Sequence, residues 1–194
     1  MPTETQFPVS TEQYHHSQSG WGSWSDIANV TADDSSDATT LLTGGQRVRC
    51  MRGYNFGFTM SGATAINTCT IKINRYNAVG AGGDFRDDWV TIEQNKTDGS
   101  PGDISGDLSD AGAWPLSMTE KSYVADVNPS IAQATNSTFG VGLAVLHEND
   151  TGGDTARVDY FKVEIDYAVA ASGGGNLFVS PFESPAFRSA AFGA

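Results

Sequence analysis

The sequence predicts an all-β protein built as a sandwich or barrel of short strands. Apolar and polar residues alternate over several short segments, and clusters of turn-forming residues separate these segments. Glycine is abundant, with 22 residues among 194, and Thr, Ser, Asn and Asp are also frequent. No window of about eleven residues carries a convincing helical period. This turn-rich composition with short apolar runs favours strands over helices.

We expect one folded domain with an arm at each end, since 194 residues suffice for one substantial core. Residues 1–20 are polar, contain two prolines and show no period, so they are predicted to form an extended N-terminal arm. Residues 21–168, which begin with the pair Trp21 and Trp24, carry the alternating segments and form the predicted domain. Residues 169–194 form the predicted C-terminal arm.

The first strong strand signal spans residues 46–60. Within it, four apolar side chains share one face of an extended chain: Tyr54, Phe56, Phe58 and Met60. Gly53 interrupts the alternation and predicts a β-bulge at that point. Residues 69–74 alternate again, and residues 89–93 form a third strand with Val90 and Ile92 on one face.

The last third of the predicted domain contains one short strand, one helical turn and two longer strands. Residues 122–127 indicate a short edge strand, and residues 130–134 suit a single helical turn. Residues 139–147 and 158–167 both alternate, and a turn-rich connector joins them. We therefore predict that these two strands pair as a closing β-hairpin. The core is predicted to contain Phe56, Phe58, Ile71, Ile73, Val90, Ile92, Val141, Leu143, Val163 and Ile165.

The C-terminal arm is too apolar for an inert tail. A glycine triplet, residues 173–175, precedes four phenylalanines that are predicted to contact partner chains: Phe178, Phe182, Phe187 and Phe192. Prolines at positions 181 and 185 restrict the arm to extended geometry. Extended apolar segments bind by adding a strand to a sheet edge or by placing rings in pockets. We therefore expect the arm to hold the protein in an assembly, and we expect the chain to form homo-oligomers.

The charge balance excludes some partners. The chain has 23 acidic and 11 basic side chains, giving a formal net charge of −12. This acidity disfavours nucleic acid, whose phosphates must be neutralised by cations, and anionic membranes. No apolar run approaches the ~18 residues of a membrane-spanning helix, and the first residues lack the pattern of a secretory signal. Cys50 and Cys69 are expected to be two buried thiols, with a single disulfide as the alternative.

Three groups of residues are candidates for a catalytic or metal-binding site. His147, beside Glu148 and Asp150, is better explained as a packed histidine at a strand end than as a catalytic base. His15 and His16 lack a third ligand at metal spacing. The aspartates at positions 98, 103, 107 and 110 could suit Ca²⁺, but they fit solvated turns better. We therefore predict no catalytic centre, no cofactor and no metal site.

Trp89 is the best candidate for stacking on a sugar, because it lies on the strand face opposite Val90 and Ile92. The alternative is that the indole is covered by the arm, by a loop or by a neighbouring subunit. This residue keeps a carbohydrate-binding module among the possible functions.

The order of the motifs resembles that of small virion structural proteins of tailed phages and prophages. The resemblance covers roughly residues 21–168 and rests on these phrases: Trp-x-x-Trp at 21–24, Ala-Thr-Thr at 38–40, Tyr-Asn-Phe-Gly-Phe at 54–58, Ser-Gly-Ala-Thr-Ala-Ile at 61–66, Ile-Lys-Ile-Asn-Arg at 71–75, Trp-Val-Thr-Ile at 89–92, Phe-Gly-Val-Gly-Leu at 139–143 and Ala-Arg-Val-Asp-Tyr-Phe-Lys-Val-Glu-Ile-Asp-Tyr at 156–167. The familiar form has a proline after Phe-Gly-Phe, where this chain has Met60 and Ser61.

The resemblance implies an antiparallel β-sandwich of the jelly-roll type, located in a virion and without chemistry of its own. The leading functional hypothesis is a capsid decoration protein that binds the major capsid protein through its arms. A tail, neck or fibre component is the nearest rival. A carbohydrate-binding adhesin module and a β-sandwich hydrolase are the hypotheses from other classes.

Overall fold

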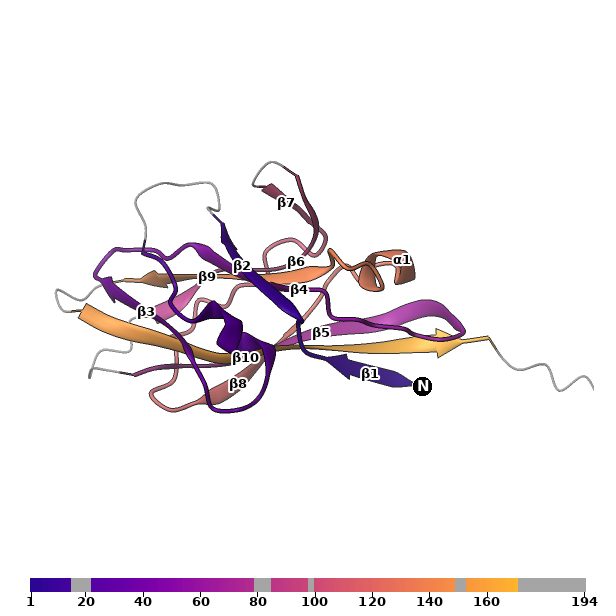
Figure 1. Cartoon of the computed structure of the whole chain (residues 1–194), viewed down its shortest axis with the longest axis horizontal. Coiled ribbons are helices and arrows are strands. Elements are labelled where there is room, and N and C mark those ends of the chain that lie inside the picture. The colour runs from indigo at the N-terminus through magenta and orange to yellow at the C-terminus, as the bar shows by residue number, and fades with distance from the viewer. Residues whose placement is uncertain (15–21, 79–84, 98–99, 149–152, 171–194) are drawn as a thin grey trace, which may run out of the picture.

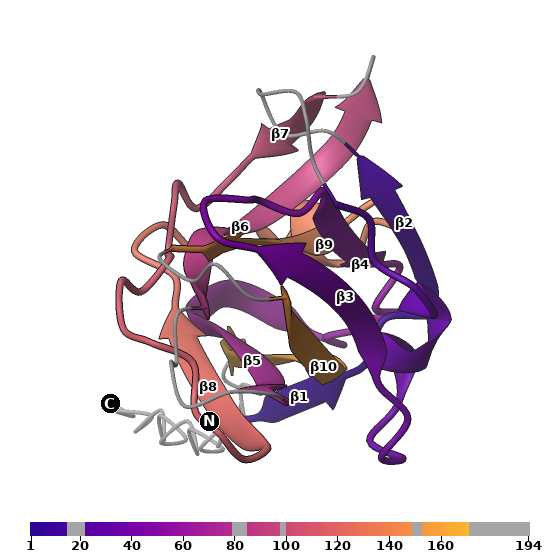
Figure 2. The ribbon, with the colours of Figure 1, turned by 90° about the vertical axis from the view of Figure 1, so that its left-hand side faces the viewer.

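The computed structural model describes residues 1–14, 22–78, 85–97, 100–148 and 153–170, and it shows two antiparallel sheets packed face to face (Figures 1 and 2). Sheet A consists of β1 (Thr3–Gln6), β3 (Ala38–Thr43), β5 (Ala63–Asn77), β8 (Thr119–Val124) and β10 (Gly153–Val169). Sheet B consists of β2 (Ser10–Tyr14), β4 (Cys50–Tyr54), β6 (Phe85–Thr97), β7 (Ser100–Asp103) and β9 (Gly140–His147). The predicted all-β antiparallel sandwich is confirmed.

Helical structure in the described ranges is limited to a 3-10 helix, Ile27–Thr31, and a single turn, α1, at Ile131–Ala134. Ser130 caps α1 by accepting a hydrogen bond from the backbone of Gln133, as the sequence signal at residues 130–134 indicated. Neither of these described helices has the length and apolar character needed to cross a bilayer.

The chain crosses between the two sheets at almost every step. Sheet B has the order β2-β4-β9-β6-β7, whereas sheet A has the order β1-β10-β5-β8, with β3 also paired to β10. Among the described strands, only β6 and β7 are consecutive and lie in the same sheet. This alternation between layers is the connectivity of a jelly roll.

The predicted closing hairpin is wrong. β9 pairs with β4 and β6 in sheet B, while β10 pairs with β1, β3 and β5 in sheet A. Each strand lies in the middle of its sheet, so their apolar faces meet across the core instead of lying side by side. Alternation identified both strands correctly, but it does not distinguish a hairpin partner from a strand in the facing layer.

One core fills the space between the sheets, and all ten predicted core residues are buried in it. The alternation at residues 55–60 has a different origin from the one expected. β4 ends at Tyr54, and the chain continues through positive φ angles at Asn55 (62°), Gly57 (71°) and Met60 (37°). This irregular segment still buries the side chains of Phe56 and Phe58. The left-handed backbone at Asn55 and Gly57 reverses the chain locally, so that both phenylalanine rings point into the core although the segment is not a strand.

The described part of the predicted extended N-terminal arm, residues 1–14, pairs with both sheets. β1 pairs with β10, from Thr3 opposite Asp166 to Gln6 opposite Val163, and β2 pairs with all of β4. The N-terminal segment therefore adds one strand to each sheet. Its half-exposed, polar strands show no apolar period, and for this reason the sequence pattern did not reveal them.

Gly53 is a site of close approach and not a bulge, since β4 keeps a continuous register with both β2 and β9. A Cβ atom at this position would lie 2.8 Å from Pro8 Cγ and 2.9 Å from Phe161 Cδ2. Pro8 follows β1 and precedes β2, so Gly53 leaves room for the chain where it changes sheets.

We predict that Gly53→Ala lowers the free energy of unfolding by about 1–3 kcal/mol, because the methyl group overpacks a filled interior. Gly153→Ala is the matched control, since its Cβ would meet Leu41 at an ordinary 3.4 Å. Urea denaturation of both variants measures the difference. Equal stabilities for the two variants would contradict the close packing of Pro8, Gly53 and Phe161.

Candidate functional site

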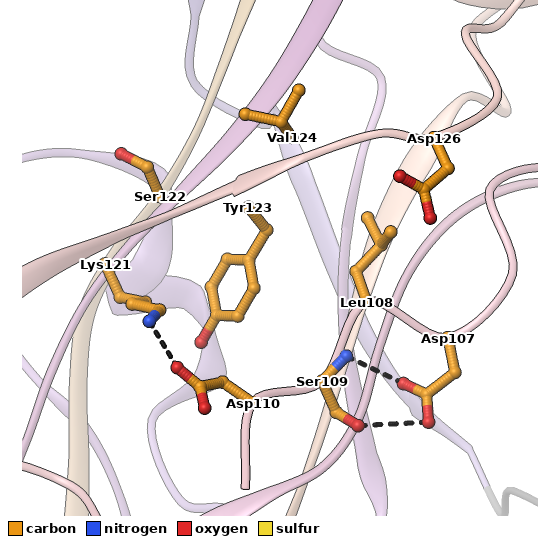
Figure 3. A pocket seen from close by; sticks show the side chains of 9 residues that line it. All are labelled: Asp107, Leu108, Ser109, Asp110, Lys121, Ser122, Tyr123, Val124 and Asp126. Atoms are coloured by element: carbon orange, nitrogen blue, oxygen red, sulfur yellow. Dashed lines mark hydrogen bonds and ion pairs between the residues drawn. The ribbon is translucent and has the colours of Figure 1, made fainter. Parts of the chain in front are cut away.

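A hollow lies beside the edge strand β8. β8 pairs with β5, and no other described strand pairs with it. Across from it runs the loop at residues 107–110, and a cavity of about 360 Å³ separates the two segments (Figure 3). We call this cavity the edge pocket; it is lined by Asp107, Leu108, Ser109, Asp110, Lys121, Ser122, Tyr123, Val124 and Asp126.

The two walls of the edge pocket belong to different sheets. Leu108 donates its backbone N–H to the carbonyl of Val90 in β6 (2.7 Å), so the loop wall is attached to sheet B. The other wall is β8 of sheet A. Leu108 and Tyr123 extend between the walls and form the apolar part of the lining (Figure 3). The pocket therefore opens where the two layers of the sandwich meet at their edges.

Short-range hydrogen bonds give the loop wall its shape. The carboxylate of Asp107 accepts from the backbone N–H of Ser109 (2.9 Å) and from its hydroxyl (3.0 Å). Asp110 accepts from the backbone N–H of Gly112 (2.9 Å) and from Lys121 of β8. Aspartates that bond backbone groups two residues later define tight turns. The Lys121–Asp110 ion pair joins the two walls at one end of the pocket (Figure 3).

Beneath the pocket, the buried carboxylate of Asp87 holds both walls together. It accepts hydrogen bonds from the hydroxyl of Tyr123 (2.7 Å), the backbone N–H of Asp110 (3.1 Å) and the indole N–H of Trp114 (2.9 Å). Arg75 Nη2 lies 3.5 Å from the same carboxylate. A bulge in β6 between Asp87 and Trp89 turns Asp87 inward, as bulges commonly re-aim side chains.

The electrostatics of the pocket follow from these contacts. Lys121 and the turn at Gly112 hold the pKa of Asp110 below its usual value. Burial, together with the nearby charge of Asp87, raises the pKa of Tyr123 far above the usual value for tyrosine. Three carboxylates line the pocket, from Asp107, Asp110 and Asp126, against the single cation Lys121. The site therefore presents a mainly polar, acidic surface beside the edge of β8, which suits a partner that carries a cation.

His147 is buried at the end of β9, as predicted. Its ring packs on Phe85 with centroids 4.7 Å apart, and Nε2 lies 3.2 Å from the carboxylate of Asp154. Asp103 also acts structurally, since it accepts from the Thr91 hydroxyl (2.6 Å) and the Gly106 backbone (2.9 Å). Across the described part of the chain, no group of three or more His, Cys, Asp or Glu side chains is arranged to hold a metal ion.

Trp89 lies on the outer face of sheet B and is half-buried. It packs against a small cluster formed by Tyr14, Cys50 and Ala144, separate from the main core. Of these three residues, Tyr14 belongs to β2, Cys50 to β4 and Ala144 to β9. Trp24 and Trp114 are buried in the main core.

The same outer face carries a buried ionic network. Glu93 accepts a hydrogen bond from the Tyr14 hydroxyl (2.6 Å) and pairs with Arg52 Nε (2.5 Å). Arg52 also pairs with Glu12 of β2 (2.7 Å). Gly142 leaves room for this network, since a Cβ there would lie 3.2 Å or less from Cys50, Tyr14 and Glu93. The network fastens the N-terminal strand to sheet B.

Some residues singled out in the sequence lie within the described ranges, and others lie outside them. Cys50 and Cys69 are buried free thiols in different sheets, and burial raises the pKa of Cys69 to about 12. Of the residues singled out in the sequence, those outside the described ranges are His15, His16, Trp21, Asp98, Asp150 and the four phenylalanines Phe178, Phe182, Phe187 and Phe192. The edge pocket was not predicted as a site from the sequence. Its only signal was the aspartate-rich stretch 103–110, which indicated turns without showing what lies opposite them.

Comparisons with known proteins do not show a family. No family model matches the sequence, and no curated protein matches it. A solved structure reported as "CBM4 structure and function" is 12% identical over 71% of this chain and 87% of that chain, with a TM-score of 0.38. A Stig cyclase, Fisc, from Fischerella sp. TAU is 10% identical over 86% of this chain and 90% of that chain, with a TM-score of 0.34. These likenesses are weak, so the fold assignment rests on strand pairing.

The ionic network predicts a pH dependence of stability. Burial raises the pKa of Glu93 from 4.5 to about 7, against the opposing effects of the Tyr14 hydrogen bond and the Arg52 charge. A raised carboxyl pKa means that the folded state holds a proton that the unfolded state releases. The contribution of Glu93 to stability is therefore fully present at about pH 4.5 and is lost as the pH rises to about 7.

We predict that the melting temperature of the native chain relative to Glu93→Gln falls by a few °C between pH 5 and pH 8. Glutamine has one carboxyl oxygen fewer than glutamate and does not titrate. The loss of stability that follows from the missing oxygen is therefore the same at both pH values and cancels when the two pH values are compared. Thermal unfolding followed by circular dichroism measures both proteins at both pH values. A constant difference between them would show that Glu93 does not take up a proton on folding.

Proposed function

We propose that the chain is a non-enzymatic structural component of a tailed-phage particle and that it acts by binding other protein chains. A capsid decoration protein is the form we favour, with a tail, neck or fibre component as the alternative position. The edge strand β8 carries the proposal, because an exposed sheet edge beside a polar, acidic hollow suits an extended protein segment.

The motifs that resemble phage virion proteins support this proposal through their structural positions. Phe56 and Phe58 of the Tyr-Asn-Phe-Gly-Phe phrase contact Phe139 of the Phe-Gly-Val-Gly-Leu phrase, with ring centroids 5.9 and 6.2 Å apart. Gly57 supplies a left-handed turn between them. The shared phrases therefore encode a core and its turns. Proteins that keep them would share a sandwich and not a catalytic site.

The polar residues of the edge pocket support binding over turnover. The carboxylates of Asp107 and Asp110 accept hydrogen bonds from nearby backbone groups and from Lys121. Carboxylates held in this way stabilise turns and present a fixed acidic rim. A glycosidase would need two carboxyl groups directed at one bond across an open cleft, whereas each of these carboxylates already accepts two hydrogen bonds from the protein.

A carbohydrate-binding role is the second candidate, and Trp89 is the observation that favours it. The indole is half-buried on the outer face of sheet B, where Trp89 pairs with Ala144 of β9. An aromatic ring on the outer face of a sheet is the kind of side chain that stacks on a sugar ring. Packing against the cluster of Tyr14, Cys50 and Ala144 reduces the indole surface that remains for stacking.

We predict that replacing the four phenylalanines of residues 178–192 with alanine reduces incorporation into particles at least tenfold while leaving the sandwich folded. β10 ends at Val169, so these substitutions lie outside every described strand. Each buried ring contributes roughly 1.5–3 kcal/mol to association, which makes the expected loss large. Quantitative mass spectrometry of purified particles measures incorporation, and thermal unfolding checks the fold.

Replacement of Ser180, Ser184 and Ser189 with alanine is the matched control and should leave incorporation unchanged. Undiminished incorporation of the phenylalanine variant would contradict binding through the C-terminal arm. A glycan array tests the second candidate directly: saccharide binding that Trp89→Ala abolishes would favour the carbohydrate-binding role over the structural one.

A further inference from the structure

Two aspartates lie next to each other where the pairing of β3 with β10 ends. The last pair of this antiparallel ladder is Ala38 with Val158. The next residues outward from that pair are Asp37 and Asp159, which we call the aspartate pair. Directly opposed residues of an antiparallel pair have Cβ atoms about 4.5–5.5 Å apart. The register therefore brings the two carboxylates close together, and like charges in such positions are destabilising.

The hydrogen bonds of the aspartate pair place both side chains on the outer face of sheet A. Asp159 accepts a hydrogen bond from Asn74 of β5 (3.1 Å), and Asp37 accepts one from Arg157 of β10 (3.2 Å). Asn74 and Arg157 each neighbour a core residue of their own strand. Because side chains alternate along a strand, both donors point to the face opposite the core. The aspartate pair therefore lies outside the main core.

Each carboxylate of the aspartate pair uses only one of its two oxygens. Both printed hydrogen bonds end on Oδ2, whereas Oδ1 of Asp37 and Oδ1 of Asp159 are buried and have no hydrogen-bond partner. Asp159 is 3% exposed, and the side chain of Asp37 is 11% exposed. Buried polar atoms are normally satisfied, so two unpartnered oxygens on neighbouring carboxylates indicate an additional ligand between them.

The surrounding charges leave this place negative. Burial raises the pKa of Asp159 against the hydrogen bond from Asn74, and the charges of Asp33 and Asp37 raise it further. Within the described residues, the ion pairs give this group one cation, Arg157, against three carboxylates. An uncompensated buried carboxylate is costly, so a positively charged ligand would be stabilising here.

We infer that Asp37 and Asp159 bind a divalent cation through their Oδ1 atoms, and that calcium is the ion this pair fits. Calcium binds carboxylate, carbonyl and water oxygens at roughly 2.3–2.6 Å, in flexible geometries of about six to eight ligands. Two carboxylates on opposed residues can both reach an ion at that distance. Magnesium fits less well, because it requires nearly ideal octahedral geometry.

Water and backbone carbonyls would complete the coordination of the ion. The described residues contain no group of three His, Cys, Asp or Glu side chains arranged around one metal position, and the aspartate pair supplies two. A site with few charged ligands binds calcium weakly, with dissociation constants of about 0.1–1 mM in comparable cases. The site is therefore expected to respond to millimolar calcium.

A cation at the aspartate pair would fasten β3 to the sandwich. Among the described strands, β3 pairs only with β10. A bulge in β10 between Val158 and Tyr160 leaves Asp159 outside the ladder with β5, as bulges commonly re-aim side chains. Neither member of the aspartate pair lines the edge pocket. The inference therefore goes beyond the proposed function and does not rest on it.

A shared proton is the alternative occupant. Protonated Asp159 could donate its Oδ1–H to Oδ1 of Asp37, which would satisfy both atoms without an ion. In that case millimolar calcium would leave the melting temperature of the native chain unchanged, and this result would overturn the inference.

Calcium titration of the full-length chain, freed of metal with a chelator, tests the inference. We expect a rise in melting temperature of about 3–6 °C at a calcium concentration of about ten times Kd. Asp37→Asn and Asp159→Asn should each weaken calcium binding at least tenfold in isothermal titration calorimetry, because each replaces a charged ligand by a neutral one. Circular dichroism checks that the variants are folded, and either folded variant alone suffices for the comparison.

Asp34→Asn is the matched control. It removes the same charge from the loop that leads into β3, but Asp34 is exposed and its carboxylate accepts a hydrogen bond from the backbone N–H of Ser36 (2.9 Å). Its calcium affinity should stay within twofold of the native value. An equal loss of affinity in the control and in the aspartate-pair variants would reveal diffuse attraction by an acidic surface, and the assigned site would be wrong.

Discussion

The carboxylate of Asp87 joins the two sheets at the side of the sandwich where β6 and β8 come together. It accepts hydrogen bonds from Tyr123 in β8, from Trp114 and from the backbone of Asp110 in the facing loop. Asp110 and Tyr123 line opposite walls of the edge pocket, so their shared hydrogen bonds to Asp87 set the distance between those walls. Removing one partner from a buried, paired charge typically costs about 3–5 kcal/mol, so the arrangement is strongly determined.

The opposite side of the molecule is secured by a second buried ionic network. Glu93, Arg52 and Glu12 fasten β2 to sheet B, while β1 pairs with β10 in sheet A. The N-terminal residues therefore add a strand to each sheet. The chain passes from sheet A to sheet B at Pro8, which packs directly on Gly53. The N-terminal strands thus form one edge of each sheet, and β8 forms the other edge of sheet A.

The predictable parts of this fold are those governed by a two-residue period and a shared core. Ile71, Ile73, Val90 and Ile92 were predicted to be buried because strict alternation leaves one interpretation, and they are buried. The pairing of β9 with β10 was predicted wrongly, since alternation identifies a half-buried face without naming the sheet that covers it. The polar strands β1 and β2 were missed because hydrogen bonding, and not apolar burial, holds them in place.

The candidate site was harder to predict than the fold. Asp87 and Tyr123 are 36 positions apart and meet only because a bulge turns Asp87 inward. The sequence showed Asp107 and Asp110 as turn residues, which they are, but nothing in the local pattern placed β8 opposite them. The packing of two sheet edges creates the pocket, and that packing depends on contacts distant in the chain.

Hydrogen–deuterium exchange of the Asp87→Asn variant tests this account most directly. If Asp87 holds both walls, exchange should rise together at residues 107–110 and 119–124 and stay unchanged in β2 and β4. Glu93→Gln serves as the matched control, since Glu93 is a buried carboxylate whose partners are Tyr14 and Arg52. Faster exchange in one wall alone, or in neither, would contradict the claim that a single buried carboxylate sets the geometry of the pocket.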